Sequence, residues 1–232
     1  ASAGGRLTID FGALAANYRA LAKMSAPAEC AAVVKADAYG IGIERAVPAL
    51  ADAGCRTFFV ALPAEGKAAR KVAPEADIYV LSGPLSGEAF EVFREHRLIP
   101  VLNSMHDIEM WRAARSLPAA LHVDTGMNRL GVSETEAKAF AEENTGADAI
   151  QLTLVMSHLA CADDSGHPMN RQQLESFQRV AALFKGIDSS LANSAGIMLG
   201  GDFRRDLTRA GVESTYQRVL KCAEGAAIAT ET

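Results

Sequence analysis

Apolar segments alternate with amphipathic segments along most of the chain. The apolar segments are short and rich in Val, Ile, Leu and Ala. Near-continuous apolar runs of this length are typical of strands that are buried on both faces of a parallel sheet. The eight segments that we predict to be strands are residues 30–36, 57–62, 77–82, 98–103, 119–124, 150–159, 190–195 and, more weakly, 204–211.

Helical patterns occupy the intervals between these segments, with apolar residues gathered on one face. Pro63 suits a first helical position, and Ser86 and Ser104 suit helix caps. Ser133 and Glu136 have the spacing of a capping box. The predicted helices are residues 42–53, 63–73, 86–96, 105–116, 134–143 and 170–185, and a short strand over 6–11 with a helix over 12–24 precedes the first unit.

Repeated alternation of strand and helix predicts a parallel α/β architecture. A closed (β/α)8 barrel, the TIM barrel, best matches eight units in about 200 residues. A doubly wound open sheet is the alternative. In a barrel, functional side chains gather just after the carboxyl ends of the strands. Polar or glycine residues follow the predicted strands in this way: Lys35, Asp37, Tyr39, Asn103, Asp124, Arg129, His158, Asn193, Ser194, Arg209 and Gly211.

Composition narrows the class of protein. Hydrophobic residues make up 49% and charged residues 22% of the 232 residues, which indicates a globular chain rather than a disordered one. The net charge is −5 and no Lys/Arg-rich run occurs, so we expect no nucleic-acid partner. We also expect no membrane span, because no apolar run reaches about 18 residues.

The cysteines point to a reducing compartment. The four cysteines are Cys30, Cys55, Cys161 and Cys222, with no CxxC spacing among them. They are interpreted as reduced thiols, and the N-terminal residues lack the pattern of a signal peptide. Both features favour a cytoplasmic protein.

Lys35 is the strongest candidate for chemistry. It lies in the apolar run AAVVKA, and burial of an ammonium group lowers its pKa towards a neutral amine. A neutral amine is what Schiff-base chemistry needs, although the long stem of a lysine at a strand end can also reach solvent. Gly40 and Gly42 follow and indicate a tight turn near a ligand, where the Tyr39 hydroxyl can reach a phosphate or a substrate.

Two further segments suit the binding of anions. Arg129 lies in the glycine-bearing segment HVDTGMNRLGV and can clamp a carboxylate, or it can be an ordinary surface arginine. Ser194 and the backbone N–H groups of Gly211 and Val212 suit a phosphate, because the loops after strands seven and eight of barrel enzymes often bind one.

The segment MSHLACADDSGH gathers residues that can bind metals. These residues are His158, Cys161, Asp163, Asp164 and His167. Their spacing matches no defined metal motif, so we predict no metal site. His158 is interpreted either as a core histidine bonded to the backbone or as a residue of a pocket.

Five segments of the chain together resemble the alanine racemase family of pyridoxal-phosphate enzymes. They are AVVKADAYG, HVDTGMNRLG, MSHLACAD, LANSAG and TRAGV, in this order. The likeness runs from about residue 6 to residue 212. It implies a cofactor-binding (β/α)8 barrel over residues 1–212, the cofactor pyridoxal 5′-phosphate, and an isomerase that interconverts L- and D-alanine and so supplies D-alanine for cell-wall peptidoglycan.

The resemblance implies a role for each matching residue. Lys35 corresponds to the lysine that carries the cofactor and acts as one of two bases, and Arg129 to the arginine beside the cofactor and the substrate carboxylate. His158 corresponds to the histidine packed on the pyridine ring. Arg209 corresponds to the arginine that faces the pyridine nitrogen, where its permanent charge disfavours protonation and so suppresses transamination. The phosphate contacts correspond to Tyr39, Ser194, Gly211 and Val212, and Asn193 lies in the same polar layer.

The sequence also departs from the family pattern. His122 stands where family members often carry a modified lysine that orients the motif arginine, whereas Ile41 and Ala210 are minor changes. The resemblance ends at Val212, and the tail over 213–232 is unlike the family's second, β-rich domain, which supplies a tyrosine base across a dimer interface. We therefore expect one of the two bases, and a homodimer as a possibility. The alternatives are a single-domain carrier of pyridoxal phosphate without turnover, and an inert barrel that serves as an interaction module.

Overall fold

Eight parallel strands form the centre of the molecule. The computed structural model describes residues 8–84, 86, 89–112 and 117–211. Neighbouring strands pair in the order β7-β6-β5-β4-β3-β2-β1-β8, and every paired ladder is parallel. Each of the eight predicted segments overlaps a strand. The seventh, residues 190–195, does so only at Ser190, because β7 ends there and helix α9 begins at Ser194. The strands are β1 (Glu29–Val33), β2 (Thr57–Val60), β3 (Asp77–Val80), β4 (Ile99–Leu102), β5 (Ala119–His122), β6 (Leu152–Met156), β7 (Asp188–Ser190) and β8 (Leu207–Gly211).

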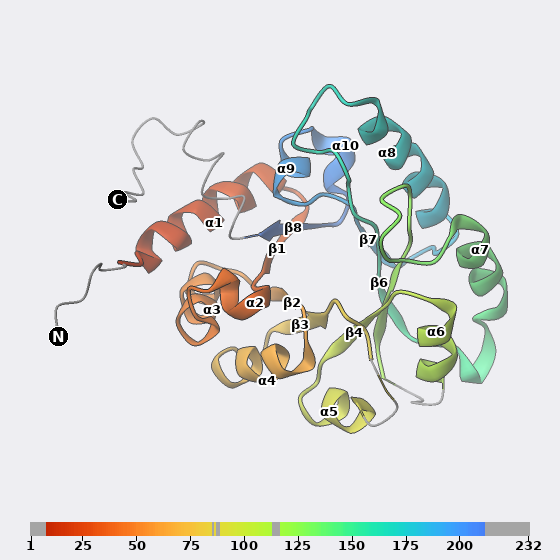
Figure 1. The fold of residues 1–232 in the computed structure, drawn as a ribbon, viewed down its shortest axis with the longest axis horizontal. Helices are drawn as coiled ribbons and strands as arrows, with labels where there is room; N and C mark the ends of the chain where they lie inside the picture. The colour runs from red at the N-terminus through yellow and green to blue at the C-terminus, as the bar shows by residue number, and fades with distance from the viewer. Residues whose placement is uncertain (1–7, 85, 87–88, 113–116, 212–232) are drawn as a thin grey trace.

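The ring of strands is nearly closed between β7 and β8. These two strands share no regular ladder, but the Asp206 N–H donates to the Ser189 carbonyl at 3.0 Å and the Arg209 N–H donates to the Ala192 carbonyl at 2.9 Å. Figure 1 shows the strands ringed by helices. The prediction of a (β/α)8 barrel is confirmed, and the open doubly wound sheet is wrong.

Helices follow the strands around this ring. The capping box of Ser133 and Glu136 is present, and the Ser104 hydroxyl accepts the Asp107 N–H at 3.1 Å, as the sequence predicts. The helices are α1 (Phe11–Ser25), α2 (Lys35–Tyr39), α3 (Ile43–Asp52), α4 (Pro63–Val72), α5 (Ala89–Glu95), α6 (Met105–Arg112), α7 (Glu134–Glu143), η1 (Gly146–Asp148), α8 (Pro168–Ala181), α9 (Ser194–Ile197) and α10 (Gly201–Arg204).

The boundaries of two helices also differ from the sequence prediction. The strand expected over 6–11 is not formed by residues 8–11, because Asp10 caps α1 by accepting the Ala13 N–H at 3.0 Å and the helix begins at Phe11. Residues 6 and 7 lie outside the described part of the chain. Helix α8 begins before residue 170, because the His167 ring accepts the Met169 N–H and Pro168 occupies the first helical position.

Alternate residues of the strands serve two cores. Phe58 faces the helices and belongs to the large core between strands and helices, together with Trp111 and Phe140. Phe59 points into the barrel, where its ring stacks on Tyr79 with the centroids 4.8 Å apart. The barrel is therefore filled by side chains on one side of the strands and covered by helices on the other.

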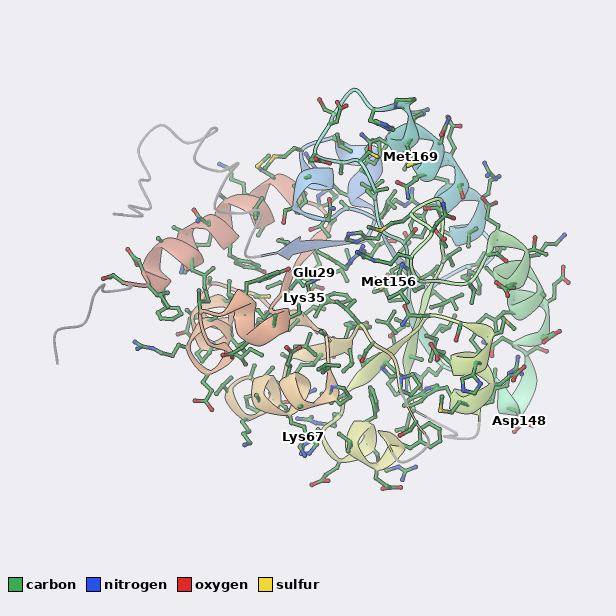
Figure 2. All side chains as sticks on the ribbon, in the orientation of Figure 1. Glu29, Lys35, Lys67, Asp148, Met156 and Met169 are labelled. Carbon is green, nitrogen blue, oxygen red and sulfur yellow. The ribbon has the colours of Figure 1, made fainter. Side chains whose placement is uncertain are left out.

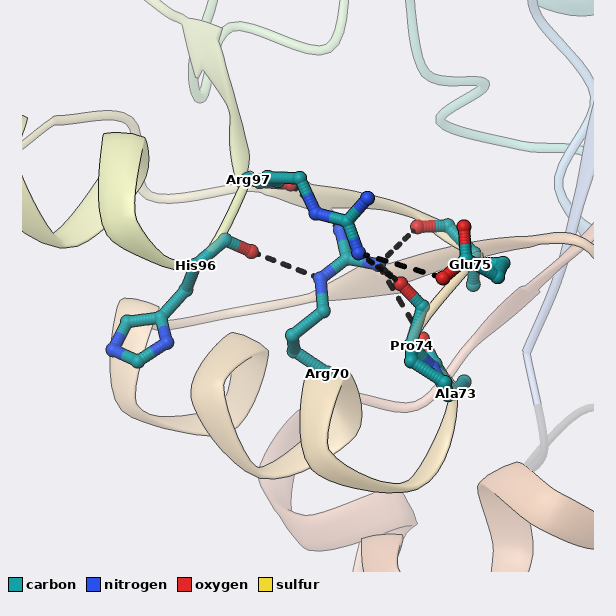
Figure 3. Close-up of polar contacts among 7 residues, drawn as sticks. Arg70, Ala73, Pro74, Glu75, His96 and Arg97 are labelled. Carbon is teal, nitrogen blue, oxygen red and sulfur yellow. Dashed lines mark hydrogen bonds and ion pairs between the residues drawn. The ribbon is translucent and has the colours of Figure 1, made fainter.

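Arg70 ties two turns together at the end of the barrel where β3 and β4 begin (Figure 3). Its guanidinium reaches from α4 to two segments: the turn that leads into β3 and the turn that leads into β4. The carbonyls that accept from it belong to Ala73, Pro74, Ala76, His96 and Arg97. Because these bonds join backbone turns at the end of the barrel opposite the cavity, we assign Arg70 a structural role.

Candidate active site

A cavity of about 430 Å³ opens at the carboxyl ends of the strands. In Figure 2, Lys35 and Met156, which both line it, lie near the middle of the barrel, whereas Lys67 and Asp148 lie at the periphery. Val212 lies outside the described residues. The other site residues that the sequence predicts all line this cavity: Lys35, Tyr39, Arg129, His158, Asn193, Ser194, Arg209 and Gly211.

Lys35 follows β1 instead of lying within it. The strand ends at Val33, and α2 (Lys35–Tyr39) is in fact a left-handed turn, in which Ala36 to Tyr39 have φ between 52° and 55°. The prediction of a strand through residue 36 is therefore wrong at its end, and Lys35 is only partly buried. The turn places Lys35 and Tyr39 on the same cavity, with the Lys35 Nζ 6.0 Å from the centre of the Tyr39 ring.

Hydrogen bonds stabilise this left-handed turn, which costs about 1–2 kcal/mol per residue for L-amino acids. The Ala38 N–H donates to the Val34 carbonyl at 2.9 Å, and the Asp37 carboxylate accepts the Ile43 N–H at 2.8 Å. The Glu65 carboxylate accepts the Asp37 N–H at 3.3 Å and the N–H groups of the loop after β2. Our sequence analysis did not single out Glu65, although its place three residues into α4 is a capping signal.

The loop between β5 and α7 presents Arg129. The Asp124 carboxylate accepts three successive N–H groups, from Gly126, Met127 and Asn128, at 2.9 to 3.1 Å. A Cβ at Gly131, where φ is +112°, would lie 2.6 Å from the Asp124 nitrogen. The aspartate and the glycines of DTGMNRLG thus shape a tight loop, and Arg129 stands exposed near its tip at the mouth of the cavity.

Arg209, which is buried, and His158, which is partly buried, lie together at the seam of the barrel. Arg209 is 3% exposed, and its guanidinium donates to the Ser190 hydroxyl and the Ser157 carbonyl. Burial lowers the pKa of Arg209 to about 10, so it stays charged at neutral pH. Its Nη2 lies 3.4 Å from His158 Nδ1. Since a guanidinium only donates, Nδ1 of His158 accepts, and the proton of the neutral ring lies on Nε2.

Burial, followed by the positive charges of Arg209 and Arg129, lowers the pKa of His158 to about 3. A neutral histidine therefore faces the cavity and offers an N–H group. The sequence left two interpretations of His158, a core histidine or a residue of a pocket. The geometry supports the second, because His158 lines the cavity while its Nδ1 lies beside Arg209.

The ends of β7 and β8 meet around Ser194. The Asn193 side chain caps the short helix α9 by accepting the Gly196 N–H at 2.8 Å. The Ser194 hydroxyl accepts the Gly211 N–H at 2.8 Å. The Ser194 hydroxyl also donates to the Gly211 carbonyl at 3.4 Å, so these polar groups of two neighbouring loops bond each other at one edge of the cavity. No acidic side chain is among the described residues that line the cavity.

The residues that line the cavity fit pyridoxal phosphate. Lys35 is an amine within the cavity, Tyr39 and Ser194 offer hydroxyl groups, and Arg129 and Arg209 are cations suited to an anionic ligand. By contrast, the described residues contain no cluster of three metal-ligating side chains. Cys161 of the segment over 156–167 lies 3.8 Å from the Met169 sulfur instead. No described helix has the length and apolarity to cross a membrane.

Comparisons with known proteins agree with this geometry. The family model "Alanine racemase, N-terminal domain" matches residues 9–216. The alanine racemase of Rhizobium meliloti is 51% identical over 215 residues, which are 91% of this chain and 56% of that protein. The biosynthetic alanine racemase of Agrobacterium fabrum is 53% identical over 211 residues, 89% of this chain and 54% of that one.

A solved structure shares the fold. The alanine racemase of Bartonella henselae, with covalently bound pyridoxal phosphate, superposes with a TM-score of 0.83 at 42% identity and covers 90% of this chain and 59% of its own. The chain thus spans a little more than half the length of the relatives it matches. On the strength of the matched model and the identities, the chain belongs to the alanine racemase family, of which it carries the N-terminal domain.

Proposed function

We propose that this chain binds pyridoxal 5′-phosphate through Lys35 and moves the α-proton of alanine. The observation that carries the proposal is the placement of Lys35 on the same cavity as Tyr39, Ser194 and Arg209. When bound, the cofactor supplies an electron sink that makes the α-proton of an amino acid acidic. The proposed barrel domain covers residues 1–212, and residues 213–232 are its tail.

In this proposal each residue of the cavity has a separate role in binding or in proton transfer. Lys35 holds the cofactor covalently and, as a free amine, takes or returns the α-proton on one face of the substrate. Arg129 binds the substrate carboxylate. Neutral His158 would lie beside the bound cofactor, and the charged Arg209 would oppose protonation of the cofactor's ring nitrogen. The cofactor phosphate is bound by Tyr39, Ser194, Gly211 and Val212, with Asn193 shaping the loop.

The unprotonated ring nitrogen limits side reactions. Arg209 is a buried cation, and it would disfavour a second positive charge on a cofactor nitrogen placed beside it, because like charges in a low-dielectric site repel strongly. The cofactor would then withdraw less charge from Cα, which would favour return of the proton to Cα. We propose racemisation rather than amino-group transfer on this basis, in the cytoplasm and for D-alanine supply.

Covalent labelling tests the proposal. Pyridoxal phosphate is added, the product is reduced with borohydride, and the labelled lysine is mapped by mass spectrometry. We expect the label on Lys35 and its loss in Lys35→Ala. Lys67→Ala, an exposed lysine of α4, is the matched control and keeps the label. A label spread over surface lysines, or one that survives Lys35→Ala, contradicts the proposal.

Hydrogen exchange separates the possible outcomes. The loaded chain is incubated with L-alanine in heavy water, and the α-hydrogen and the configuration are followed by NMR and chiral chromatography. Deuterium at Cα with D-alanine formed indicates racemisation, and a homodimer that supplies a second base is then the expected assembly. Deuterium with retained configuration indicates proton transfer by Lys35 alone. A labelled chain without any exchange is a cofactor carrier, and the racemase proposal is then wrong.

A further inference from the structure

Gln173 is a buried glutamine in the second turn of α8. Only 1% of its surface is exposed, whereas Gln172, the residue before it, is exposed. Leu174, Phe177 and Val180 of the same helix are buried as well, but they are apolar and pack in the large core. Burying an amide costs free energy unless its polar atoms are bonded. The partners of this amide therefore indicate what it does.

The Gln173 amide bonds the segments that follow β5 and β6. Its Oε1 accepts the Ala160 N–H at 2.8 Å, and its Nε2 donates to the His158 carbonyl at 2.9 Å and to the Thr125 hydroxyl oxygen at 3.2 Å. A backbone N–H only donates and a carbonyl only accepts, so these partners fix the orientation of the amide. Both hydrogens of Nε2 are thus used, one for each segment.

The segment after β6 is held by Gln173 and by Arg209. The Arg209 guanidinium donates to the Ser157 carbonyl, one residue before His158. Gln173 bonds the carbonyl of His158 itself and the N–H of Ala160, two residues later. The His158 ring, which lines the cavity with its Nδ1 3.4 Å from Arg209, therefore extends from a backbone that is fixed before and after it.

The loop that carries Arg129 is attached to the same amide through Thr125. The Thr125 hydroxyl accepts from Gln173 and also lies 2.8 Å from the Ser157 hydroxyl. A Cβ at Gly126 would lie 3.7 Å from the Gln173 Cγ, so the aliphatic part of the glutamine lies close beside the loop as well. Arg129 follows in this loop at the mouth of the cavity.

We propose that Gln173 is a positioning residue: its single amide joins the Arg129 loop to the His158 segment and so keeps Arg129 and His158 at a fixed separation across the cavity. A carboxylate bound by Arg129 and a cofactor beside His158 then meet in one geometry, because neither segment moves without breaking a hydrogen bond to a buried amide. The inference rests on the proposed function, in which Arg129 binds the substrate carboxylate and His158 lies beside the cofactor.

The first test needs no cofactor and asks whether Gln173 acts on both segments. Gln173→Met keeps an unbranched side chain of similar length but forms none of the three hydrogen bonds. Gln172→Met is the matched control, because Gln172 is exposed on the same helix. Long-range ¹H–¹⁵N NMR of the His158 ring and ¹⁵N relaxation of the Gly126 N–H are recorded, and urea unfolding shows that each variant is folded.

We expect Gln173→Met to broaden the His158 ring signals, through exchange between tautomers, and to lower the order parameter of the Gly126 N–H. Gln172→Met should leave both signals unchanged. If Gln173→Met does not fold, Gln173→Glu replaces it, since its carboxyl group has at most one donor and cannot hold both segments. Unchanged signals at either site in Gln173→Met, or at both sites in Gln173→Glu, overturn the inference whether or not Lys35 binds pyridoxal phosphate.

The second test measures alanine binding in the chain loaded with pyridoxal phosphate, followed by the absorbance of the cofactor. We expect the Kd for alanine to rise about tenfold in Gln173→Met and about threefold in Thr125→Val, and to stay at the wild-type value in Thr125→Ser, which keeps the hydroxyl. Because Thr125 acts through Gln173, the double variant Thr125→Val/Gln173→Met should have the Kd of Gln173→Met alone rather than the product of both effects.

Labelling of Lys35 separates this inference from the proposed function. Gln173 and Thr125 are not among the described residues that line the cavity, so the borohydride label should be retained in all these variants. A wild-type Kd in Gln173→Met, or effects that multiply in the double variant, overturn the inference. A wild-type chain that takes no label or binds no alanine contradicts the proposed function alone, and the NMR signals then still decide whether Gln173 joins the two segments.

Discussion

Two neutral histidines face one cavity with opposite tautomers. Asn103 sets the proton of His122 on Nδ1, because its amide nitrogen donates to two backbone carbonyls and its oxygen, which only accepts, faces that ring. Arg209 sets the proton of His158 on Nε2. The two rings therefore present an acceptor and a donor although they are chemically identical. Burial is the largest cause of the lowered pKa of each ring. At the scale of single residues, the polarity of this wall depends on neighbours that do not themselves react.

Because His122 and His158 are neutral in the folded chain, we expect the stability of the fold to decrease in acid. In the unfolded chain a histidine has a pKa near 6.5, whereas the pKa of His122 is lowered to about 4 and that of His158 to about 3. The unfolded chain therefore binds more protons below pH 6.5, and the free energy of unfolding falls as the pH falls. Between pH 6.5 and 5 the loss is about 2 kcal/mol for each histidine.

Urea unfolding at several pH values measures this effect. His122→Gln should lower the stability near pH 7.5 but flatten its decrease between pH 6.5 and 5 by about 2 kcal/mol. His106→Gln, which changes an exposed histidine of α6, should leave the pH dependence as it is in the wild type. A pH dependence that is the same in all three proteins contradicts the assignment of neutral, buried histidines.

At the scale of elements, the loops at the carboxyl ends of the strands carry the unusual backbone. The turn after β1 runs through four L-residues in the left-handed region and is joined to α4 by Glu65. The loop after β5 folds back on its own strand, through a bridge between Val123 and Val132. Short, strongly hydrogen-bonded loops of this kind hold Lys35 and Arg129 in place without regular secondary structure.

Gly131 is the position where this loop tolerates no side chain. Gly131→Ala places a Cβ 2.6 Å from the Asp124 nitrogen at a φ of +112°, so we expect a loss of about 2–4 kcal/mol in the free energy of unfolding and weaker alanine binding. Gly146→Ala is the matched control: φ is +79°, but the Cβ meets no atom within 4 Å. Denaturant unfolding should show a loss of only about 1 kcal/mol there. Equal losses in both variants argue against steric exclusion at Gly131.

The elements predicted from the sequence are largely those of the structure, because local signals determine them. Apolar runs locate seven of the eight strands, and Ser133 with Glu136 locates the start of α7. The seventh predicted segment meets β7 only at Ser190, because β7 is short and polar. The left-handed turn at Ala36–Tyr39 has no such signal, since it depends on Glu65 nearly thirty residues away. Residues 8–11 do not form the expected strand either. Their apolar–polar alternation suggested one, but Asp10 caps a helix that begins at Phe11.

Most of the site residues were predicted from their positions after the predicted strands, and likeness to a family then gave their roles. The structure places the described ones on one cavity. What the likeness could not supply is the surroundings of His122, the residue in which this chain departs from the family pattern. Its partner Asn103 lies nineteen residues earlier and on another strand end, so only the fold brings the two together. Val212, the remaining predicted site residue, lies outside the described residues and stays a prediction.

At the scale of the whole molecule, the two ends of the barrel have different tasks. The cavity lies where the strands end, and the Arg70 cluster lies where β3 and β4 begin. Arg70 reaches five backbone carbonyls, some of which become unsatisfied if its side chain is removed. Stability and chemistry should therefore respond to different substitutions.

Arg70→Ala tests this division. We expect the free energy of unfolding to fall by about 2–4 kcal/mol, while labelling of Lys35 by pyridoxal phosphate under native conditions is retained. Arg171→Ala removes an exposed ion pair with Glu175 and should cost less than about 1 kcal/mol. If Arg70→Ala is as stable as Arg171→Ala, the cluster in Figure 3 does not stabilise the barrel.

The seam between β7 and β8 is fastened by a side chain as well as by the backbone. Arg209 bonds the Ser190 hydroxyl across this seam and at the same time lines the cavity. The same guanidinium therefore joins two strands of the barrel and contributes its charge to the cavity. A substitution of Arg209 that changes the charge inside the cavity therefore also removes a bond between two strands. Reactivity and stability cannot be altered separately at this position.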